Sequence, residues 1–168
     1  MFKGAVIVMG VTSCGKTSVG ETLAGLLAAP FVEGDVLHPP ANIAKMSAGI
    51  ALNDADRWPW LDLIGASLLG NSAKVASCSA LKRIYRQRLV AAAQRPITFV
   101  FLQGTHAQLA DRIAARKNHF MPPSLLDSQL ATLEPPTTEE GALIFDISMS
   151  VSEIATLAFS QLSKLEPT

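Results

Sequence analysis

The sequence lacks several features that would place it in a specialised class of protein. It has only two cysteines, Cys14 and Cys78, which excludes a framework of disulfide bonds and predicts reduced thiols in a reducing compartment. Lys and Arg together number 14, as do Asp and Glu, so no net field would attract nucleic acid or an anionic membrane. We therefore expect no nucleic-acid partner and no membrane partner, and any anion must bind through local groups.

Long hydrophobic runs are also missing. The mean hydropathy of +0.30 is high, but no uninterrupted apolar stretch approaches the roughly 18 residues of a membrane span. The stretch Ala5–Met9, after Lys3, is too short for a signal peptide and leads into a glycine-rich loop, so a cytoplasmic location is expected. The 168 residues predict one domain, residues 1–168, and leave a homodimer open.

The pattern with the clearest chemical meaning is G-x-x-x-x-G-K-[ST], which is matched by Gly10, Val11, Thr12, Ser13, Cys14, Gly15, Lys16 and Thr17. An apolar run precedes it and an amphipathic stripe follows it, formed by Val19, Leu23, Leu26 and Leu27. This context favours a phosphate-binding loop, whose N–H groups hold the phosphates of ATP, over a glycine-rich turn without a nucleotide. Lys16 is expected to reach the β- and γ-phosphates, and Thr17 to bind Mg²⁺ through its hydroxyl.

Strand-like and helix-like segments alternate along the chain, which predicts an α/β fold with a parallel five-stranded sheet between helices, a three-layer P-loop NTPase. The expected strands are 5–9, 31–33, 74–78, 97–102 and 142–146. The helices expected between them are 41–47, one capped by Asp54 or Asp56 and stopped at Gly70, 79–93, 105–117, and one from Ser150. In the helix expected from Ser79, we predict Leu81, Ile84, Tyr85 and Leu89 to face inward and Lys82, Arg83, Arg86 and Gln87 outward. Other residues predicted to face inward are Ile43, Met46, Trp60, Leu61, Ile64, Leu68, Leu109, Ile113, Ile154, Leu157 and Leu162.

A proline-rich stretch separates the last two helices of this series. Pro122, Pro123, Pro135 and Pro136 lie within it, and a short helix is expected near 125–130. We predict that residues 117–137 form a lid over the nucleotide.

Asp35 is the best candidate for a group that orients the acceptor hydroxyl and takes its proton, because it follows the second strand and ligands bind at the carboxyl ends of parallel strands. A solvated turn residue is the alternative. His38 has two readings, a hydrogen bond to a polyol or a cap on the next turn. Arg57, Lys82 and Arg86 suit a carboxylate on the substrate, although a solvated helix face is the usual place for such side chains.

Further residues, in this order and spacing, resemble the gluconokinases. The matching stretches are Gly34-Asp35-Val36-Leu37-His38-Pro39, Asn42, Lys45-Met46, Leu52-Asn53-Asp54, Asp56-Arg57, Pro59-Trp60-Leu61, Cys78-Ser79-Ala80-Leu81-Lys82, Tyr85-Arg86, Arg116-Lys117, His119-Phe120-Met121, Ser128-Gln129 and Thr132-Leu133-Glu134-Pro135. The resemblance, over about residues 5–147, implies a nucleoside-monophosphate-kinase-like fold with ATP and Mg²⁺ as reactants. It also implies that D-gluconate is phosphorylated at O6 to give 6-phosphogluconate.

The sequence departs from the family pattern at a few positions. Glu33 stands where the family usually has Asp, Pro40-Ala41 where charged residues are common, and Asn118 where Gly is usual. The segment between Leu61 and Cys78 is a few residues short. None of these changes replaces Lys16, Thr17 or Asp35. The third strand contains no acid. In this it resembles the family pattern, which implies that Mg²⁺ is left to Thr17 and water, with an outer-shell place for Asp35 left open.

Arg112 and Arg116 lie four residues apart and so share one helix face. Arg116, which matches the family motif, is expected to reach the transferring phosphate when the lid closes. Arg112 would support Arg116 or cover the adenine. Solvation at the surface is the alternative for both side chains.

Three rival functions are weighed against this interpretation. A small regulatory GTPase needs an N-K-x-D segment, which the sequence lacks. A shikimate or adenylate kinase is nearer in fold, yet residues 34–61 fit neither pattern. An ATP-binding module without catalysis is disfavoured by the presence of Lys16, Thr17, Asp35 and Arg116.

Overall fold

The computed structural model describes residues 1–116 and 123–165. Five strands form a parallel sheet in the order β2-β3-β1-β4-β5, which confirms the predicted sheet. Their bounds are Ala5–Met9 for β1, Phe31–Glu33 for β2, Lys74–Ser77 for β3, Ile97–Gln103 for β4 and Leu143–Asp146 for β5.

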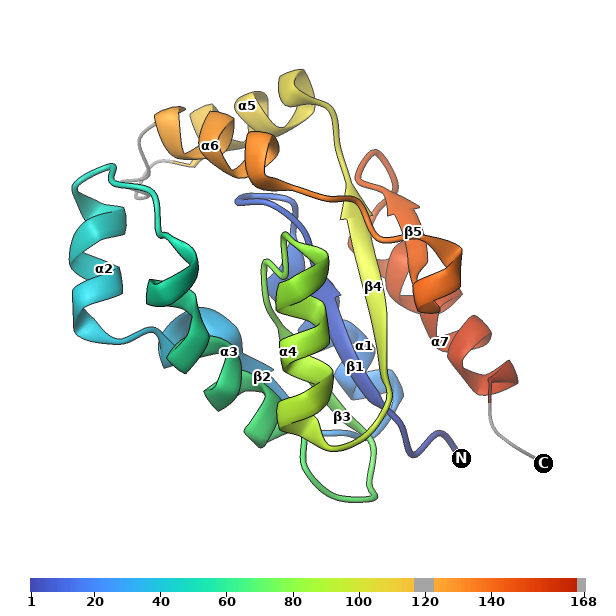
Figure 1. Ribbon diagram of the computed structural model, residues 1–168. Helices are drawn as coiled ribbons and strands as arrows, with labels where there is room; N and C mark the ends of the chain where they lie inside the picture. Colours follow the sequence, from blue (N-terminus) through green and yellow to red (C-terminus); the bar gives the residue numbers. More distant parts are fainter. Residues whose placement is uncertain (117–122, 166–168) are drawn as a thin grey trace.

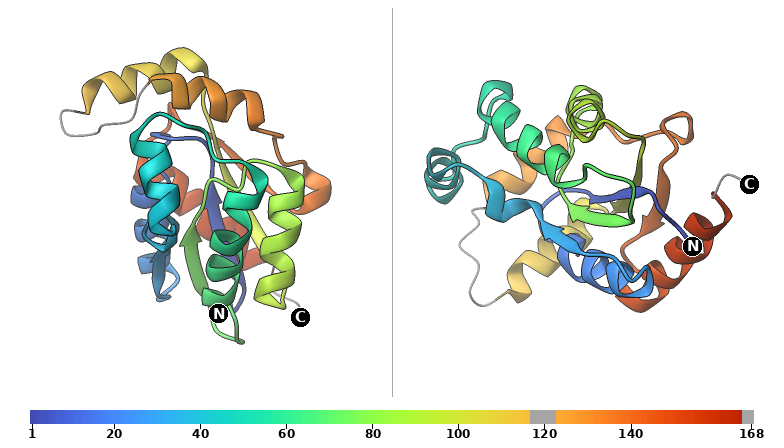
Figure 2. Two further views of the ribbon diagram at one scale, coloured as in Figure 1. Left: turned by 60° about the vertical axis from the view of Figure 1, so that its left-hand side comes forward. Right: turned by 90° about the horizontal axis from the view of Figure 1, so that it is seen from below.

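Helices cover both faces of the sheet, so the molecule has three layers (Figures 1 and 2). Helices α3 (Asp54–Ser67) and α4 (Arg83–Ala93) pack together on one face, and α1 (Lys16–Leu26) and α7 (Val151–Lys164) on the other. The remaining helices are α2 (Pro40–Ser47), α5 (His106–Ala115), α6 (Pro123–Thr132) and the 3₁₀ turns η1 (Gly34–Leu37) and η2 (Thr138–Glu140). Within the described ranges, no helix has both the length and the apolar character needed to cross a membrane.

The central strand β1 explains why the loop after it is so well placed. All five of its residues are buried, because β3 and β4 pair with its two edges and helices cover its faces. Ala5 lies in register with Lys74 on one side and Ile97 on the other. The carboxyl ends of β1, β2 and β3 therefore meet at one edge of the sheet, from which the phosphate loop, η1 and the segment before α4 continue.

The start of α4 corrects the sequence prediction. The helix begins at Arg83 with Lys82 as its N-cap, not at Ser79, because Ala80 takes a left-handed conformation with φ 46°. Ile84, expected inside, is 45% exposed, and Arg86, expected outside, is only 2% exposed. The guanidinium of Arg86 is buried because Glu140 and two backbone carbonyls satisfy it there.

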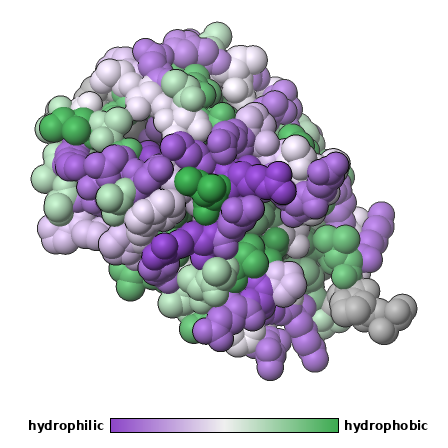
Figure 3. Space-filling model, in the orientation of Figure 1, coloured by the Kyte–Doolittle hydropathy of each residue, from purple (hydrophilic) through white to green (hydrophobic). Residues whose placement is uncertain are grey.

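Three more residues expected in the core are exposed: Leu26, Ile43 and Leu157. Figure 3 shows apolar side chains scattered among hydrophilic ones on the face that carries α3 and α4. The amphipathic pattern predicts which face of a helix is apolar, but packing against the neighbouring helix decides which residues at the border of that face are buried.

The helix ends follow the predicted caps with small shifts. The capping boxes of Thr105 with Gln108 and of Ser150 with Glu153 are confirmed. Asn53, and not Asp54 or Asp56, is the N-cap of α3. That helix ends at Ser67, short of the stop expected at Gly70, and α5 ends at Ala115 with Arg116 as its C-cap.

The predicted lid is described only in part, since residues 117–122 lie outside the described ranges. Its expected short helix is confirmed as α6, which packs against α5 (Figure 1).

Candidate active site

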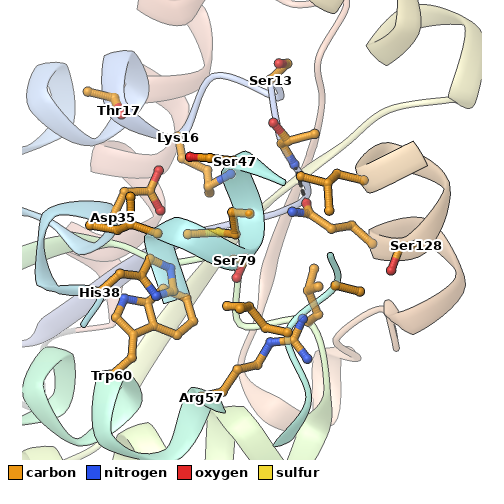
Figure 4. Close-up of a pocket in the computed structure, with 18 of the residues that line it drawn as sticks. Ser13, Lys16, Thr17, Asp35, His38, Ser47, Arg57, Trp60, Ser79 and Ser128 are labelled. Carbon is orange, nitrogen blue, oxygen red and sulfur yellow. Dashed lines mark hydrogen bonds between the residues drawn. The ribbon is translucent and has the colours of Figure 1, made fainter. Parts of the chain in front are cut away.

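A cavity of about 400 Å³ lies at the carboxyl edge of the sheet. Its walls come from the phosphate loop, η1, α2, the start of α3, the segment between β3 and α4, the end of α5 and α6 (Figure 4). The predicted site residues that line it are Thr12, Ser13, Gly15, Lys16, Thr17, Asp35, His38, Arg57 and Arg116. Lys82, Arg86 and Arg112 do not line it. The structure therefore brings together most of the residues singled out from the sequence and excludes three of the cations.

The phosphate loop needs glycine at its first position for two reasons. Gly10 has φ 148°, and a Cβ there would lie 2.7 Å from Cys14 Sγ and 3.0 Å from the Leu102 carbonyl oxygen. The ammonium of Lys16 donates to the carbonyl of Val11 at 2.9 Å, which holds it at the loop. Together these features form a cationic, N–H-rich cradle suited to phosphates.

Arg112 braces this loop from outside the cavity. Its Nη1 donates to the carbonyl of Cys14 at 3.1 Å and its Nη2 to the carbonyl of Ile147 at 2.6 Å. The guanidinium thus links the loop to the turn between β5 and α7. Arg116 lies one turn later and is exposed. Of these two arginines, it is the one that lines the cavity.

Glu33 contacts the phosphate loop, although the sequence analysis treated it only as a departure from the family pattern. One oxygen of its carboxylate accepts from the Thr17 hydroxyl, and the other accepts from Ser77 Oγ at 2.5 Å. Ser77 Oγ in turn accepts from the Gly34 N–H at 3.0 Å. The available signal was its position: the last residue of a strand, at the edge where ligands bind.

Asp35 projects from η1 into the cavity, as does Lys16 from α1 (Figure 4). Its backbone is closely held: a Cβ on Gly34 would lie 1.9 Å from the Ser77 carbonyl oxygen, and Trp60 Nε1 donates to the Gly34 carbonyl at 2.8 Å. Within residues 1–116 and 123–165, no hydrogen bond or ion pair engages the Asp35 carboxylate. Both oxygens are therefore available to accept from a ligand.

His38 is held as a neutral donor. Its ring stacks on Trp60 with 4.0 Å between centroids, and burial lowers its pKa from 6.5 to about 4, against the raising effect of Asp35. The Asn42 amide nitrogen lies 3.3 Å from His38 Nδ1 and also donates to the Asp56 carbonyl at 2.8 Å. Because Nδ1 accepts, the proton sits on Nε2, so His38 is suited to donate a hydrogen bond and not to act as a base at neutral pH.

Arg57 is the buried cation of the cavity. It is 8% exposed, its Nη1 donates to the Tyr85 hydroxyl at 2.8 Å, and its guanidinium lies over the Tyr85 ring. The Tyr85 hydroxyl donates to Asp54, and burial together with this bond raises the pKa of Tyr85. Among the described residues no carboxylate pairs directly with Arg57, so its charge is free to bind an anion in the cavity.

Lys82 and Arg86 are occupied elsewhere. Lys82 pairs with Asp54 at 3.2 Å, a hydrogen bond that raises the pKa of Lys82. Arg86 donates to both oxygens of Glu140, at 2.8 and 3.2 Å, which lowers the pKa of that carboxyl. Arg86 thereby joins α4 to η2, the turn that follows the lid, and contributes to the frame of the site.

Gln129 on α6 also lines the cavity, next to Ser128. Its Oε1 accepts from the Thr12 N–H at 2.7 Å, the contact drawn as a dashed line in Figure 4. No chemical pattern in the sequence singles out Gln129, which was named only as part of the resemblance to the gluconokinases.

No protein-family model matches the chain. The chain is 50% identical over 139 residues to a gluconokinase of Gluconobacter oxydans, covering 80% of this chain and 78% of that protein. It is 39% identical to the thermosensitive gluconokinase of Escherichia coli, covering 88% of this chain and 81% of the relative.

Solved structures that resemble this chain also include a gluconokinase. A gluconokinase from Sinorhizobium meliloti superposes with a TM-score of 0.90 at 49% identity, covering 98% of this chain and 94% of the other. A sugar kinase from Janibacter superposes at 0.88 with 36% identity, covering 96% and 95%. Shikimate kinase from Aquifex aeolicus, at 12% identity and a TM-score of 0.60 over 95% and 96% of the two chains, shares the fold alone.

Proposed function

Since the chain belongs to the gluconokinase family, we propose that it transfers the γ-phosphoryl group of ATP to O6 of D-gluconate, giving 6-phospho-D-gluconate and ADP. The observation that best supports this proposal is that the groups needed for both reactants line one cavity. A phosphate loop with Lys16, the unengaged carboxylate of Asp35 and the buried cation of Arg57 all line it. A sugar acid has matching groups, a hydroxyl to phosphorylate at one end and a carboxylate at the other.

On the nucleotide side, Lys16 and the loop N–H groups would bind the β- and γ-phosphates and the charge that develops during transfer. The oxygen donors of Thr17 and Glu33 suit Mg²⁺, which prefers oxygen ligands. No cluster of three or more acidic, His or Cys side chains occurs in the described part of the chain, so the phosphates and water would supply the other ligands. When bound, Mg²⁺ would neutralise charge on the phosphates.

On the acceptor side, Asp35 would accept the proton of the O6 hydroxyl as this oxygen bonds to the γ-phosphorus. The bond between that phosphorus and the β–γ bridging oxygen breaks, and its electron pair leaves with ADP. His38 would donate from Nε2 to a substrate hydroxyl, and Arg57 would bind the gluconate carboxylate in place of the solvent. Arg116 would reach the transferring phosphoryl group, while Arg112 holds the phosphate loop.

The remaining expectations belong to the same proposal. A cytoplasmic location and a role in gluconate utilisation fit a kinase whose two cysteines are both free and buried. The balanced charge supports a small-molecule partner over nucleic acid, and a homodimer stays open.

ADP release, coupled to NADH oxidation, tests the function directly. We expect turnover with ATP and D-gluconate, and at most trace release with shikimate, AMP or ATP alone. Turnover with shikimate or AMP in place of gluconate would assign a different kinase of the same fold. ATP binding without release on any acceptor would indicate a module without catalysis.

A further inference from the structure

Among the described residues, one side-chain hydrogen bond joins α6 to the phosphate loop. Gln129 Oε1 accepts from the backbone N–H of Thr12 at 2.7 Å, across 117 positions of sequence. Thr12 is 8% exposed, so its N–H has little access to water and Gln129 satisfies it. The carboxamide is half-buried and lines the same cavity as Asp35 and Arg57.

This contact fixes which way the carboxamide faces. A backbone N–H can only donate, so Oε1 must point at Thr12 and Nε2 must point away from it. No described residue accepts from Nε2. The side chain therefore offers a neutral N–H donor, held in one orientation, at the wall of the cavity.

The position of α6 does not depend on this bond. Leu125 and Leu126 are buried beneath the helix at 3% and 2% exposure. After the helix, the Glu134 N–H donates to the Leu81 carbonyl at 2.8 Å, and Glu134 Oε1 accepts from the Arg83 N–H at 3.0 Å. Arg86 holds Glu140 further on. Substitution of Gln129 is therefore expected to leave the fold intact.

We propose that Gln129 is a specificity-determining residue that donates from Nε2 to a hydroxyl of the polyol acceptor. The proposal rests on the proposed function. It adds to that function a residue of the cavity wall that recognises the carbon chain of the acceptor, between the hydroxyl that reacts and the carboxylate. Cations such as Lys16 and Arg116 suit a phosphoryl group, whereas a neutral amide suits a hydroxyl. Asp35, His38 and Arg57 belong to η1 and α3, so Gln129 would hold the acceptor from α6.

Two variants separate the donor from the acceptor atom of this side chain. Gln129→Glu keeps an oxygen for the Thr12 N–H but loses the donor, and Gln129→Met loses both. For both we expect the KM for gluconate to rise about 10-fold or more at pH 8, with kcat and the KM for ATP changed less than about 3-fold. Asp127→Asn, an exposed change on the same helix, is the matched control and is expected to behave as wild type.

The split between KM and kcat gives a readout that a packing role would not reproduce. Loss of packing at the cavity wall would change kcat and the KM for ATP as well, whereas loss of one hydrogen bond to the acceptor raises the KM for gluconate alone. An unchanged KM for gluconate in both variants overturns the proposal, and an equal rise in the KM for ATP assigns Gln129 to the phosphates instead. Failure of the wild-type protein to phosphorylate gluconate at all refutes the proposed function itself, which is a separate outcome.

Discussion

The nucleotide side and the acceptor side of the cavity are built in different ways. The phosphate loop is eight consecutive residues that run from the end of β1 into the first turn of α1, and most of its donors are backbone N–H groups. The acceptor side takes Asp35 from η1, His38 from the end of η1, Arg57 from α3 and Gln129 from α6. A contiguous loop is specified by local conformation, whereas the acceptor side depends on how distant elements pack.

Two buried arginines, Arg57 on the acceptor side and Arg86 outside the cavity, show how packing decides the role of a side chain. Both are buried, at 8% and 2% exposure, yet only Arg57 lines the cavity. Arg86 has a carboxylate partner in Glu140, while Arg57, among the residues that the structure describes, hydrogen-bonds only to the neutral hydroxyl of Tyr85. The presence or absence of a buried counter-charge thus separates a structural arginine from one suited to an anionic ligand.

The largest expected effect is on the nucleotide side. Lys16→Ala should lower kcat by about 10³ or more, because the ammonium stabilises charge on the transferring phosphate. Circular dichroism and the melting temperature should match the wild type, since the hydrogen bonds of this side chain to described residues all lie within its own loop. Normal turnover in the folded variant would remove the loop from the mechanism.

Removing the proposed base on the acceptor side should lower kcat by slightly less. Asp35→Asn keeps the shape but loses basicity, so kcat should fall at least about 100-fold while ATP affinity, measured by calorimetry, changes little. If kcat is retained and only the KM for gluconate rises, Asp35 is a binding residue.

Arg116 and Arg112 test where the nucleotide side ends. Arg116→Ala should lower kcat by about 100-fold with modest change in the KM for ATP. Arg112→Ala should instead raise the KM for ATP and lower the melting temperature, because it releases the carbonyls of Cys14 and Ile147. The two assignments would have to be exchanged if the two variants showed the opposite pattern.

A matched pair sharpens the comparison of the two buried arginines. Arg57→Met should raise the KM for gluconate by about 100-fold, since the carboxylate loses its cation. Arg86→Met should leave that KM near the wild-type value but lower the free energy of unfolding by about 3 kcal/mol, because Glu140 is left unpaired. Urea titration and steady-state kinetics measure the two effects, and a KM effect in both variants would contradict the separation.

The smallest effect concerns His38 and pH. The unfolded side chain binds a proton below pH 6.5, but the folded one does so only near pH 4, so unfolding becomes easier as the pH falls through this window. The contribution is constant above pH 6.5 and changes by at most about 1.4 kcal/mol per pH unit below it. His38→Gln should show a shallower fall in stability between these pH values, and equal slopes would mean that His38 titrates normally.

Much of the fold was predictable because its signals are local. Buried strands such as β1 and β4 are short apolar runs, and the capping boxes of α5 and α7 lie within four residues each. The prediction of where α4 begins was wrong, because no glycine or proline indicates the left-handed turn at Ala80. Ile84 and Arg86 were assigned to the wrong sides of this helix for a different reason. Hydrophobicity alone predicts that a charged side chain is exposed, and it does not reveal that the charge has a buried partner.

The phosphate loop, the parallel sheet and the resemblance to the gluconokinases could all be predicted from the sequence alone, because each depends on residues that are adjacent or regularly spaced. The folded structure was needed to show that Glu33 contacts Thr17, that Arg57 and not Arg86 lines the cavity, and that Gln129 contacts Thr12. These contacts join residues 16 to 117 positions apart. The energy of a charge or a hydrogen bond depends on which partner packing brings within about 3 Å, and no local pattern in the chain encodes that partner.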